Sequence, residues 1–290
     1  MFSGVFTALV TPFRNDRVDE EALRRLVNDQ IDNGIDGLVP CGTTGESATL
    51  DVEEHLRVIK IVVAEAKKRV PVVAGTGANS TKEAIELSKA AQDAGADGML
   101  QVTPYYNKPT QDGLFHHFKT IIEAVPLPTV LYNVPGRTAC DLLPETLERL
   151  CALDKVVAVK EATGSAARAA EIIARIGDRL AVLSGDDATA FALYALGGKG
   201  CISVLSNIAP KDMSAMWDAA VAGQWNEARA LHYKLFALSQ GLFVESNPIP
   251  VKAALAMMGR MTEEIRPPLY PLSAKFRDKL AQQLSQAGLL

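Results

Sequence analysis

The sequence has 290 residues, a hydrophobic content of 48% and a formal net charge of -4. A chain of this length can bury one large core, so we expect one dominant α/β domain with at most a small appendage. The Lys and Arg residues are scattered, which excludes the electrostatic footprint of a nucleic-acid or anionic-membrane partner. We therefore expect a small-molecule partner.

The sequence begins with MFSGVFTALVTPF, which has no basic leader or cleavage site, and no apolar stretch reaches the length that spans a membrane. The cysteines (Cys41, Cys140, Cys151 and Cys201) are far apart and form neither a CxxC pair nor a disulfide-dense pattern. We expect reduced cysteines in the core and a cytoplasmic protein.

Short apolar runs typical of buried parallel strands alternate with amphipathic helical segments. The runs are 5–11, 36–41, 71–76, 97–103, 128–134, 156–162, 180–185 and 200–204. The helical segments include 51–68, 81–94 and 165–176. Eight βα units in a row predict an α/β fold of the (β/α)8 type, the TIM barrel. A doubly wound sheet is less favoured, because no GxGxxG follows an early strand.

After residue 204 the strand pattern stops and helical segments follow. They lie near 211–222, 225–240, 248–258 and 273–287. We place the domain boundary at residue 224. Residues 1–224 are then a catalytic (β/α)8 barrel, and residues 225–290 are a C-terminal helical domain.

Lys160 lies at the end of the apolar run VVAVKEATG, where a TIM barrel carries its active site. Burial of an ammonium is costly unless the group is paired or gives up its proton. An amine without its proton can attack a carbonyl carbon and form a Schiff base. The alternative is a lysine that extends to solvent or pairs with a carboxylate such as Glu161.

Polar residues end the neighbouring strands as well. Tyr132 ends the adjacent strand, about 5 Å away in a sheet, so its phenol can transfer protons or simply be hydrogen-bonded in the barrel. Thr43 and Thr44, in a turn flanked by glycines, can bind a carboxylate and a phenol or only satisfy their own backbone. Arg137 can hold a carboxylate with its planar fork or be a surface loop residue.

Two further patterns narrow the chemistry. Asp186 and Asp187 follow the seventh strand and would repel a phosphate there, which disfavours a phosphosugar substrate. The four histidines belong to no HExxH or Cys/His cluster, which disfavours a metal-dependent aldolase or hydrolase. We expect no metal and no cofactor, so that carbonyl chemistry must use the lysine.

Four motifs together resemble the pyruvate-dependent Schiff-base aldolase superfamily: GTTGES (42–47), VTPYYNKP (102–109), LYNVPGRT (131–138) and KEATG (160–164). The resemblance covers essentially the whole chain. It implies a TIM barrel with a C-terminal helical domain, usually a homotetramer built as a dimer of dimers, in the cytoplasm. It also implies a lyase that condenses pyruvate with L-aspartate 4-semialdehyde, the first committed step of lysine biosynthesis through diaminopimelate.

The resemblance also implies catalytic roles for individual residues. Lys160 would form the Schiff base with pyruvate, and Tyr132 would be the general acid and base. Thr44 would bind the pyruvate carboxylate and join a proton relay with Tyr132, supported by Thr43. Tyr106 would complete the relay from the neighbouring subunit.

Three more residues would bind substrate. Arg137 would hold the semialdehyde carboxylate, while Gly185 and Ile202 would line the pyruvate pocket through backbone groups. The arginine favours this synthase over relatives that release pyruvate from N-acetylneuraminate or from 2-keto-3-deoxy sugar acids. A barrel that senses a keto acid or an amino acid without turnover is less favoured, because it would not need all these groups.

A second site is implied for L-lysine as a feedback inhibitor, in a cleft at an interface between subunits. The matching positions are Ser47, Ala48, His55, Asn79, Glu83 and Tyr105. Glu83 is the natural partner for the ammonium of the inhibitor. Val52 replaces a histidine that is often found on this surface in inhibited enzymes. The alternative for His55 and Glu83 is an ordinary helix surface.

Overall fold

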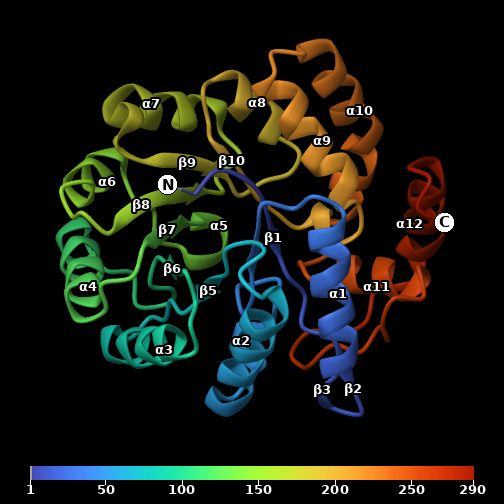
Figure 1. Cartoon of the computed structure of the whole chain (residues 1–290), viewed down its shortest axis with the longest axis horizontal. Helices are drawn as coiled ribbons and strands as arrows, with labels where there is room; N and C mark the ends of the chain where they lie inside the picture. The colour runs from blue at the N-terminus through green and yellow to red at the C-terminus, as the bar shows by residue number, and fades with distance from the viewer. Residues whose placement is uncertain (1) are drawn as a thin grey trace.

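Eight parallel strands form one sheet in the order β4-β1-β10-β9-β8-β7-β6-β5. The computed structural model describes residues 2–290 and shows helices surrounding these strands (Figure 1). The strands are β1 (Gly4–Ala8), β4 (Gly37–Val39), β5 (Val73–Gly75), β6 (Gly98–Val102), β7 (Thr129–Asn133), β8 (Val156–Glu161), β9 (Ala181–Ser184) and β10 (Gly200–Ser203). A parallel bridge between Leu38 and Val72 closes the ring. The predicted (β/α)8 barrel is confirmed, and each predicted run overlaps one strand.

The first run is shorter than predicted. β1 ends at Ala8 because Val10 N–H donates to the side-chain Oδ1 of Asn207 (3.1 Å) instead of a neighbouring strand. A small antiparallel hairpin that the sequence did not predict follows, formed by β2 (Phe13–Arg14) and β3 (Arg17–Val18). It lies beside the start of α1 (Figure 1).

The helices pack around the strands and extend beyond the last strand. They are α1 (Glu20–Asp32), α2 (Val52–Ala66), α3 (Thr81–Asp93), α4 (Gln111–Ala124), α5 (Pro135–Thr138), α6 (Pro144–Leu150), α7 (Ala166–Ile176), α8 (Ala190–Ala195), α9 (Pro210–Val221), α10 (Trp225–Gly241), α11 (Ile249–Met257) and α12 (Ala274–Gln286). Several begin at a side-chain cap. Asp51, for example, accepts from Glu54 N–H at 2.8 Å and fixes the start of α2.

The barrel interior and the layer between strands and helices are both apolar. Side chains from all eight strands, including Phe6, Leu100 and Ile202, fill the interior. A second apolar layer lies between the strands and α4, α6 and α7. Buried strands with apolar side chains on both faces explain the continuous apolar runs in the sequence. α10 packs on α9, and α11 and α12 follow as the C-terminal helices (Figure 1).

One buried ion pair joins the C-terminal helices to the barrel. Lys252 on α11 and Glu46, in the turn after β4, have their Nζ and Oε1 atoms 2.5 Å apart, and both side chains are 1% exposed. Lys252 also donates to the carbonyl of Thr11 at 2.9 Å. Burial lowers the pKa of Lys252, and the charge of Glu46 opposes that shift. The C-terminal helices therefore hold the turn that carries the GTTGES motif.

Removal of one partner of this pair should destabilise the fold. Lys252→Met leaves the Glu46 carboxylate buried without its cation and should cost about 3 kcal/mol of unfolding free energy. Lys252→Met combined with Glu46→Gln removes both charges and should regain most of that loss. Urea unfolding followed by far-UV circular dichroism measures the difference. Equal stabilities of the single and double variants would contradict the assignment.

Candidate active site

Lys160 and Tyr132 are direct partners on adjacent strands. β7 and β8 pair in parallel, with Tyr132 opposite Lys160 and Asn133 opposite Glu161. Since side chains alternate along a strand, Tyr132 and Lys160 face the barrel interior. The Lys160 Nζ lies 4.3 Å from the centre of the Tyr132 ring, and the side chain of Lys160 is nearly fully buried. The predicted proximity of the two residues is confirmed.

Glu161 does not serve as the partner of Lys160. Its carboxylate lies on the opposite face of β8, where Asn133 Nδ2 donates to Oε2 at 3.1 Å and Thr163 N–H donates to Oε1 at 2.7 Å. Side-chain alternation is the physical reason, because consecutive residues of a strand face opposite sides of the sheet. The alternative in which Lys160 is neutralised by the next residue is therefore excluded by the fold.

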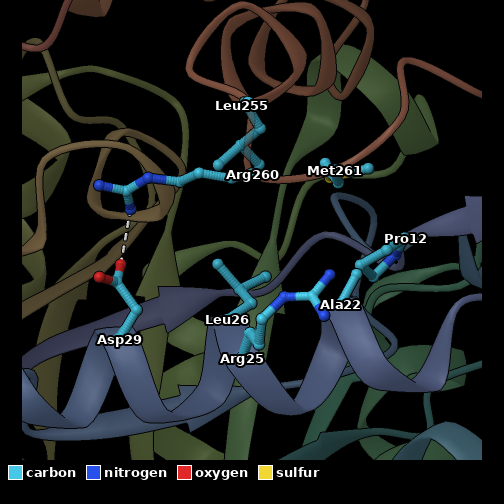
Figure 2. A pocket seen from close by; sticks show the side chains of 9 residues that line it. Pro12, Ala22, Arg25, Leu26, Asp29, Leu255, Arg260 and Met261 are labelled. Carbon is cyan, nitrogen blue, oxygen red and sulfur yellow. Dashed lines mark hydrogen bonds and ion pairs between the residues drawn. The ribbon is translucent and has the colours of Figure 1, made fainter.

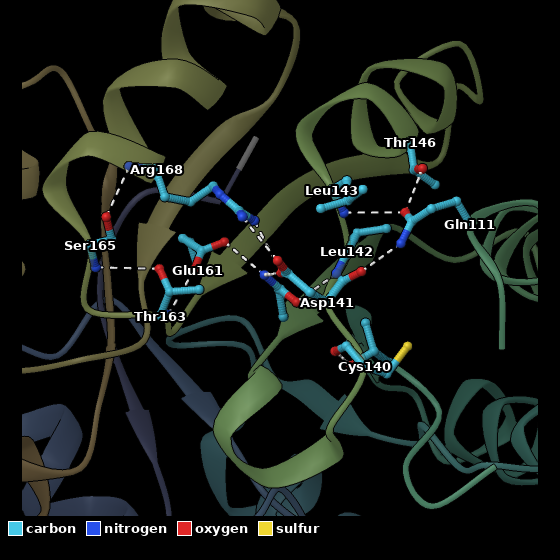
Figure 3. A network of polar contacts seen from close by, with 12 residues as sticks. Gln111, Cys140, Asp141, Leu142, Leu143, Thr146, Glu161, Thr163, Ser165 and Arg168 are labelled. Carbon is cyan, nitrogen blue, oxygen red and sulfur yellow. Dashed lines mark hydrogen bonds and ion pairs between the residues drawn. The ribbon is translucent and has the colours of Figure 1, made fainter. Parts of the chain in front are cut away.

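A polar network outside the barrel holds the ends of β7 and β8 together (Figure 3). Asn133 Nδ2 bridges Glu161 and Asp141, with the Asp141 Oδ1 at 2.9 Å. Arg168 binds Asp141 with two hydrogen bonds of 3.0 and 2.9 Å. The hydrogen bonds from Arg168 and Asn133 lower the pKa of Asp141, although burial opposes them. This network fixes the two strands whose inward residues are Tyr132 and Lys160.

A cavity of about 280 Å³ opens at the mouth of the barrel beside Lys160. Six of the eight predicted catalytic and substrate-binding residues line it: Thr43, Thr44, Tyr132, Arg137, Lys160 and Gly185. Thr44 is buried in the turn after β4, whereas Arg137 is exposed on α5 at the rim. Hydroxyl groups and a cation thus surround one buried amine, an arrangement suited to binding a carboxylate near a nucleophile.

The other two predicted residues lie elsewhere. Ile202, on β10, is buried in the barrel interior with Tyr132 and does not line the cavity. Tyr106 lies on the loop after β6, is 90% exposed and has a positive φ of 74°. Within one chain, Tyr106 does not join the cavity. The expectation that it acts from a neighbouring subunit stays a prediction.

Gly185 directly follows β9, the seventh strand of the barrel, and lies against the Lys160 side chain. A Cβ atom at Gly185 would lie 2.6 Å from the Cβ of Ala162 and 3.0 Å from Cε of Lys160. Any residue other than glycine at position 185 would therefore collide with the Lys160 side chain. Asp187 was expected to face the barrel mouth, but it does not. Its buried carboxylate instead accepts hydrogen bonds from the N–H groups of Val204 and Leu205 (3.0 and 2.9 Å).

Asn247 lines the cavity and is not among the residues predicted from the sequence. It lies between α10 and α11 and is 5% exposed. Its Nδ2 donates to Thr44 Oγ1 at 3.0 Å, and its backbone carbonyl accepts from Arg137 Nη2 at 3.1 Å. Asn247 is far along the chain from these partners and belongs to no polar motif at a strand end. No local signal in the sequence identifies it.

A second cavity of about 410 Å³ lies next to the first. Five of the six residues predicted for lysine line it: Ser47, Ala48, His55, Glu83 and Tyr105. The sixth, Asn79, is adjacent and donates to the carbonyl of Tyr105 at 3.2 Å. The two cavities share four lining residues, namely Thr43, Val134, Arg137 and Asn247.

Charged and titratable groups shape the second cavity. His55 is buried, and its Nε2 lies 2.8 Å from the carbonyl oxygen of Gly75. Burial lowers the pKa of His55, while the nearby charge of Glu83 opposes that change. Burial and Glu83 both raise the pKa of Tyr105. A negative charge on an exposed glutamate beside this cavity suits a cationic ligand.

A third cavity, of about 290 Å³, separates α1 from the chain that follows α11 (Figure 2). Leu26 and Leu255 contribute apolar walls, and Asp29 pairs with Arg260 across it at 2.6 Å. It contains none of the predicted site residues. Its two acidic and basic partners, Asp29 and Arg260, neutralise each other.

Residues 2–290 contain no helix with the length and apolar character needed to cross a bilayer. In the same range, no three His, Cys, Asp or Glu side chains are grouped so that they could hold a metal ion. The four cysteines are unpaired, and three of them are buried.

A TIM barrel with a buried amine among hydroxyl groups at its mouth has the architecture of a lysine-dependent aldolase. The model of the Dihydrodipicolinate synthetase family matches residues 1–287. A relative from Geotalea uraniireducens, named 4-hydroxy-tetrahydrodipicolinate synthase, is 57% identical over 290 residues and the full length of both chains. The chain therefore belongs to the dihydrodipicolinate synthetase family, and it is an enzyme of the lyase class.

Solved structures agree with this assignment. A chloride-inhibited dihydrodipicolinate synthase from Acinetobacter baumannii, complexed with pyruvate, has a TM-score of 0.98 and 50% identity, with all of both chains covered. A synthase from Cyanidioschyzon merolae with lysine bound has a TM-score of 0.97 and 41% identity, covering 100% of this chain and 99% of its own.

The contact between Gly185 and Lys160 can be tested by adding one methyl group. Gly185→Ala should displace the Lys160 side chain and lower kcat with pyruvate and aspartate semialdehyde roughly 100-fold. Gly136→Ala is the matched control, because a Cβ at Gly136 meets no atom within 4 Å. A Gly185→Ala enzyme as active as the control would show that the lysine does not need this space.

Proposed function

We propose that the protein condenses pyruvate with L-aspartate 4-semialdehyde to 4-hydroxy-tetrahydrodipicolinate, the reaction for which its relatives are named. The reaction is the first committed step of lysine biosynthesis through diaminopimelate. The observation that carries the proposal is the buried amine of Lys160 beside the ring of Tyr132 at the barrel mouth. Membership of the family supports the choice of substrates.

The reaction begins at Lys160. Its unprotonated amine attacks the keto carbon of pyruvate, and loss of water gives an imine. Removal of a proton from the methyl group converts the imine into an enamine, whose carbon attacks the aldehyde of the semialdehyde. The amino group of the joined product then attacks the imine carbon, closes the ring and releases Lys160.

Each of these steps moves a proton, and the presence of Thr43, Thr44 and Tyr132 in one cavity supports a relay through their hydroxyl groups. We assign the general acid and base role to Tyr132, which lies directly opposite Lys160. Thr44 binds the pyruvate carboxylate and passes protons to Tyr132, with Thr43 beside it. Tyr106 completes the relay from a neighbouring subunit, a role that suits its exposed side chain.

Substrate binding uses the rim and the barrel wall. The guanidinium of Arg137 holds the carboxylate of the semialdehyde, supported by its position at the rim of the cavity. Gly185 leaves room for the imine beside Lys160. Ile202 contributes through its backbone at the pyruvate end.

The second cavity is the proposed site for L-lysine as a feedback inhibitor. A relative with lysine bound supports it, as does the placement of Glu83 for an ammonium group. Because the two cavities share Arg137 and Asn247, a ligand in one can alter the other. Val52 lines this cavity at a position where inhibited enzymes often have a histidine.

We also propose a homotetramer built as a dimer of dimers, a cytoplasmic location, and a functional division at residue 224. The exposed tyrosines Tyr105 and Tyr106 favour a subunit contact beside the second cavity. The unpaired cysteines suit a reducing compartment. The division at 224 lies in the turn between α9 and α10.

Turnover with alternative substrates tests the reaction assignment. The enzyme should consume pyruvate and L-aspartate 4-semialdehyde together and should not release pyruvate from N-acetylneuraminate or a 2-keto-3-deoxy sugar acid. Lys160→Ala should abolish this turnover while the protein stays folded, as judged by circular dichroism. Cleavage of the sugar acids without condensation of the semialdehyde would move the protein to the pyruvate-releasing lyases.

The role of Arg137 makes a separate prediction. Arg137→Ala should raise the KM for the semialdehyde at least tenfold, because a charge-assisted bidentate contact is lost. The KM for pyruvate should change little. Arg175→Ala, on the outer surface of α7, is the control for removal of one cation. Equal damage to the use of both substrates would contradict the assignment.

A further inference from the structure

We infer that Asn247 is a positioning residue that keeps the Thr44 hydroxyl as a hydrogen-bond acceptor, so that the proton of this hydroxyl stays available to the reaction. The inference deepens the proposed function and rests on the relay assigned there to Thr44. It adds a polar residue from the C-terminal segment to a site whose other polar groups come from the barrel.

The contacts of Asn247 converge on two groups of the cavity. Its side chain donates from Nδ2 to Thr44 Oγ1 at 3.0 Å, and its main-chain carbonyl accepts from Arg137 at 3.1 Å. Thr44 and Asn247 are 2% and 5% exposed. Water therefore does not compete for the bond between them. One residue thus fixes both the carboxylate-binding threonine and the rim arginine.

The direction of the bond decides what Thr44 can do. A threonine hydroxyl has one proton and two lone pairs, whereas an amide nitrogen can only donate. Because Nδ2 donates to Oγ1, the Thr44 proton must point away from Asn247. Thr44 and Tyr132 line the same cavity, so a phenolate or a carboxylate there can accept that proton.

The other end of the amide is unpaired. Asn247 Oδ1 is buried and has no hydrogen-bond partner within residues 2–290. The bond donated to Thr44 is the polar side-chain contact that Asn247 makes within the described residues.

An isosteric substitution reverses the bond. The ionised carboxylate of Asn247→Asp can only accept a hydrogen bond, so the Thr44 hydroxyl would donate to it. The Thr44 proton would then no longer be available to the reaction, and kcat should fall about 100-fold. As the pH falls from about 8 to about 5, the buried carboxyl regains its own proton and can donate again. Activity relative to wild type should then recover. Asn247→Leu loses the donor permanently and should show no recovery.

Further variants separate positioning from packing. Asn247→Gln keeps the donor and should retain more activity than Asn247→Leu, which tests the inference even if Asn247→Asp does not fold. In a Thr44→Val background, Asn247→Asp should have little further effect, because its partner is gone. Asn226→Asp, on the exposed first turn of α10, controls for the added charge.

The outcomes distinguish the inference from the proposed function. Absence of wild-type turnover with pyruvate and the semialdehyde would overturn the proposed function. With wild type and Asn226→Asp both active, an Asn247→Asp enzyme with the wild-type pH profile would overturn only the inference. Equal, pH-independent losses in Asn247→Asp, Asn247→Gln and Asn247→Leu would also overturn it and would assign Asn247 to packing.

Discussion

The register between β7 and β8 is the constraint on which the site depends. It sets Tyr132 opposite Lys160 inside the barrel and Asn133 opposite Glu161 outside it. The same alternation of side chains that buries the Lys160 amine puts the Glu161 carboxylate on the other face of the sheet. There Glu161 is hydrogen-bonded to Asn133 and to the backbone of Thr163. The lysine is left with an aromatic ring as its neighbour and with the substrate as its reaction partner.

Residues of the C-terminal segment contact the turn after β4 that carries Thr44. Lys252 holds the turn after β4 through Glu46, and Asn247 reaches Thr44 in the same turn. The turn therefore takes its shape from residues about 200 positions further along the chain. Because Asn247 and Arg137 also line the second cavity, the site for the keto acid and the proposed site for lysine share a wall. A ligand at the proposed lysine site would therefore touch residues that also line the cavity beside Lys160.

Local patterns predicted most of this architecture. Apolar runs gave the eight strands, because each parallel strand is buried on both faces. The strand ends then gathered six site residues in one cavity. These local patterns could not predict contacts between residues that are far apart in the sequence. The end of β1 depends on Asn207, the orientation of Asp187 depends on backbone donors near Leu205, and Asn247 meets Thr44 only in the folded chain. Tyr106 lies outside the cavity within one chain, and its role from a second subunit stays a prediction.

The central claim is that Lys160, alone among the lysines, captures a keto acid covalently. Incubation with pyruvate, reduction with borohydride and peptide mass spectrometry test it directly. The account predicts one added three-carbon fragment, located on Lys160, and none on the fully buried Lys252, whose amine is paired with Glu46. A protein without the fragment, or with it on another lysine, would contradict the account.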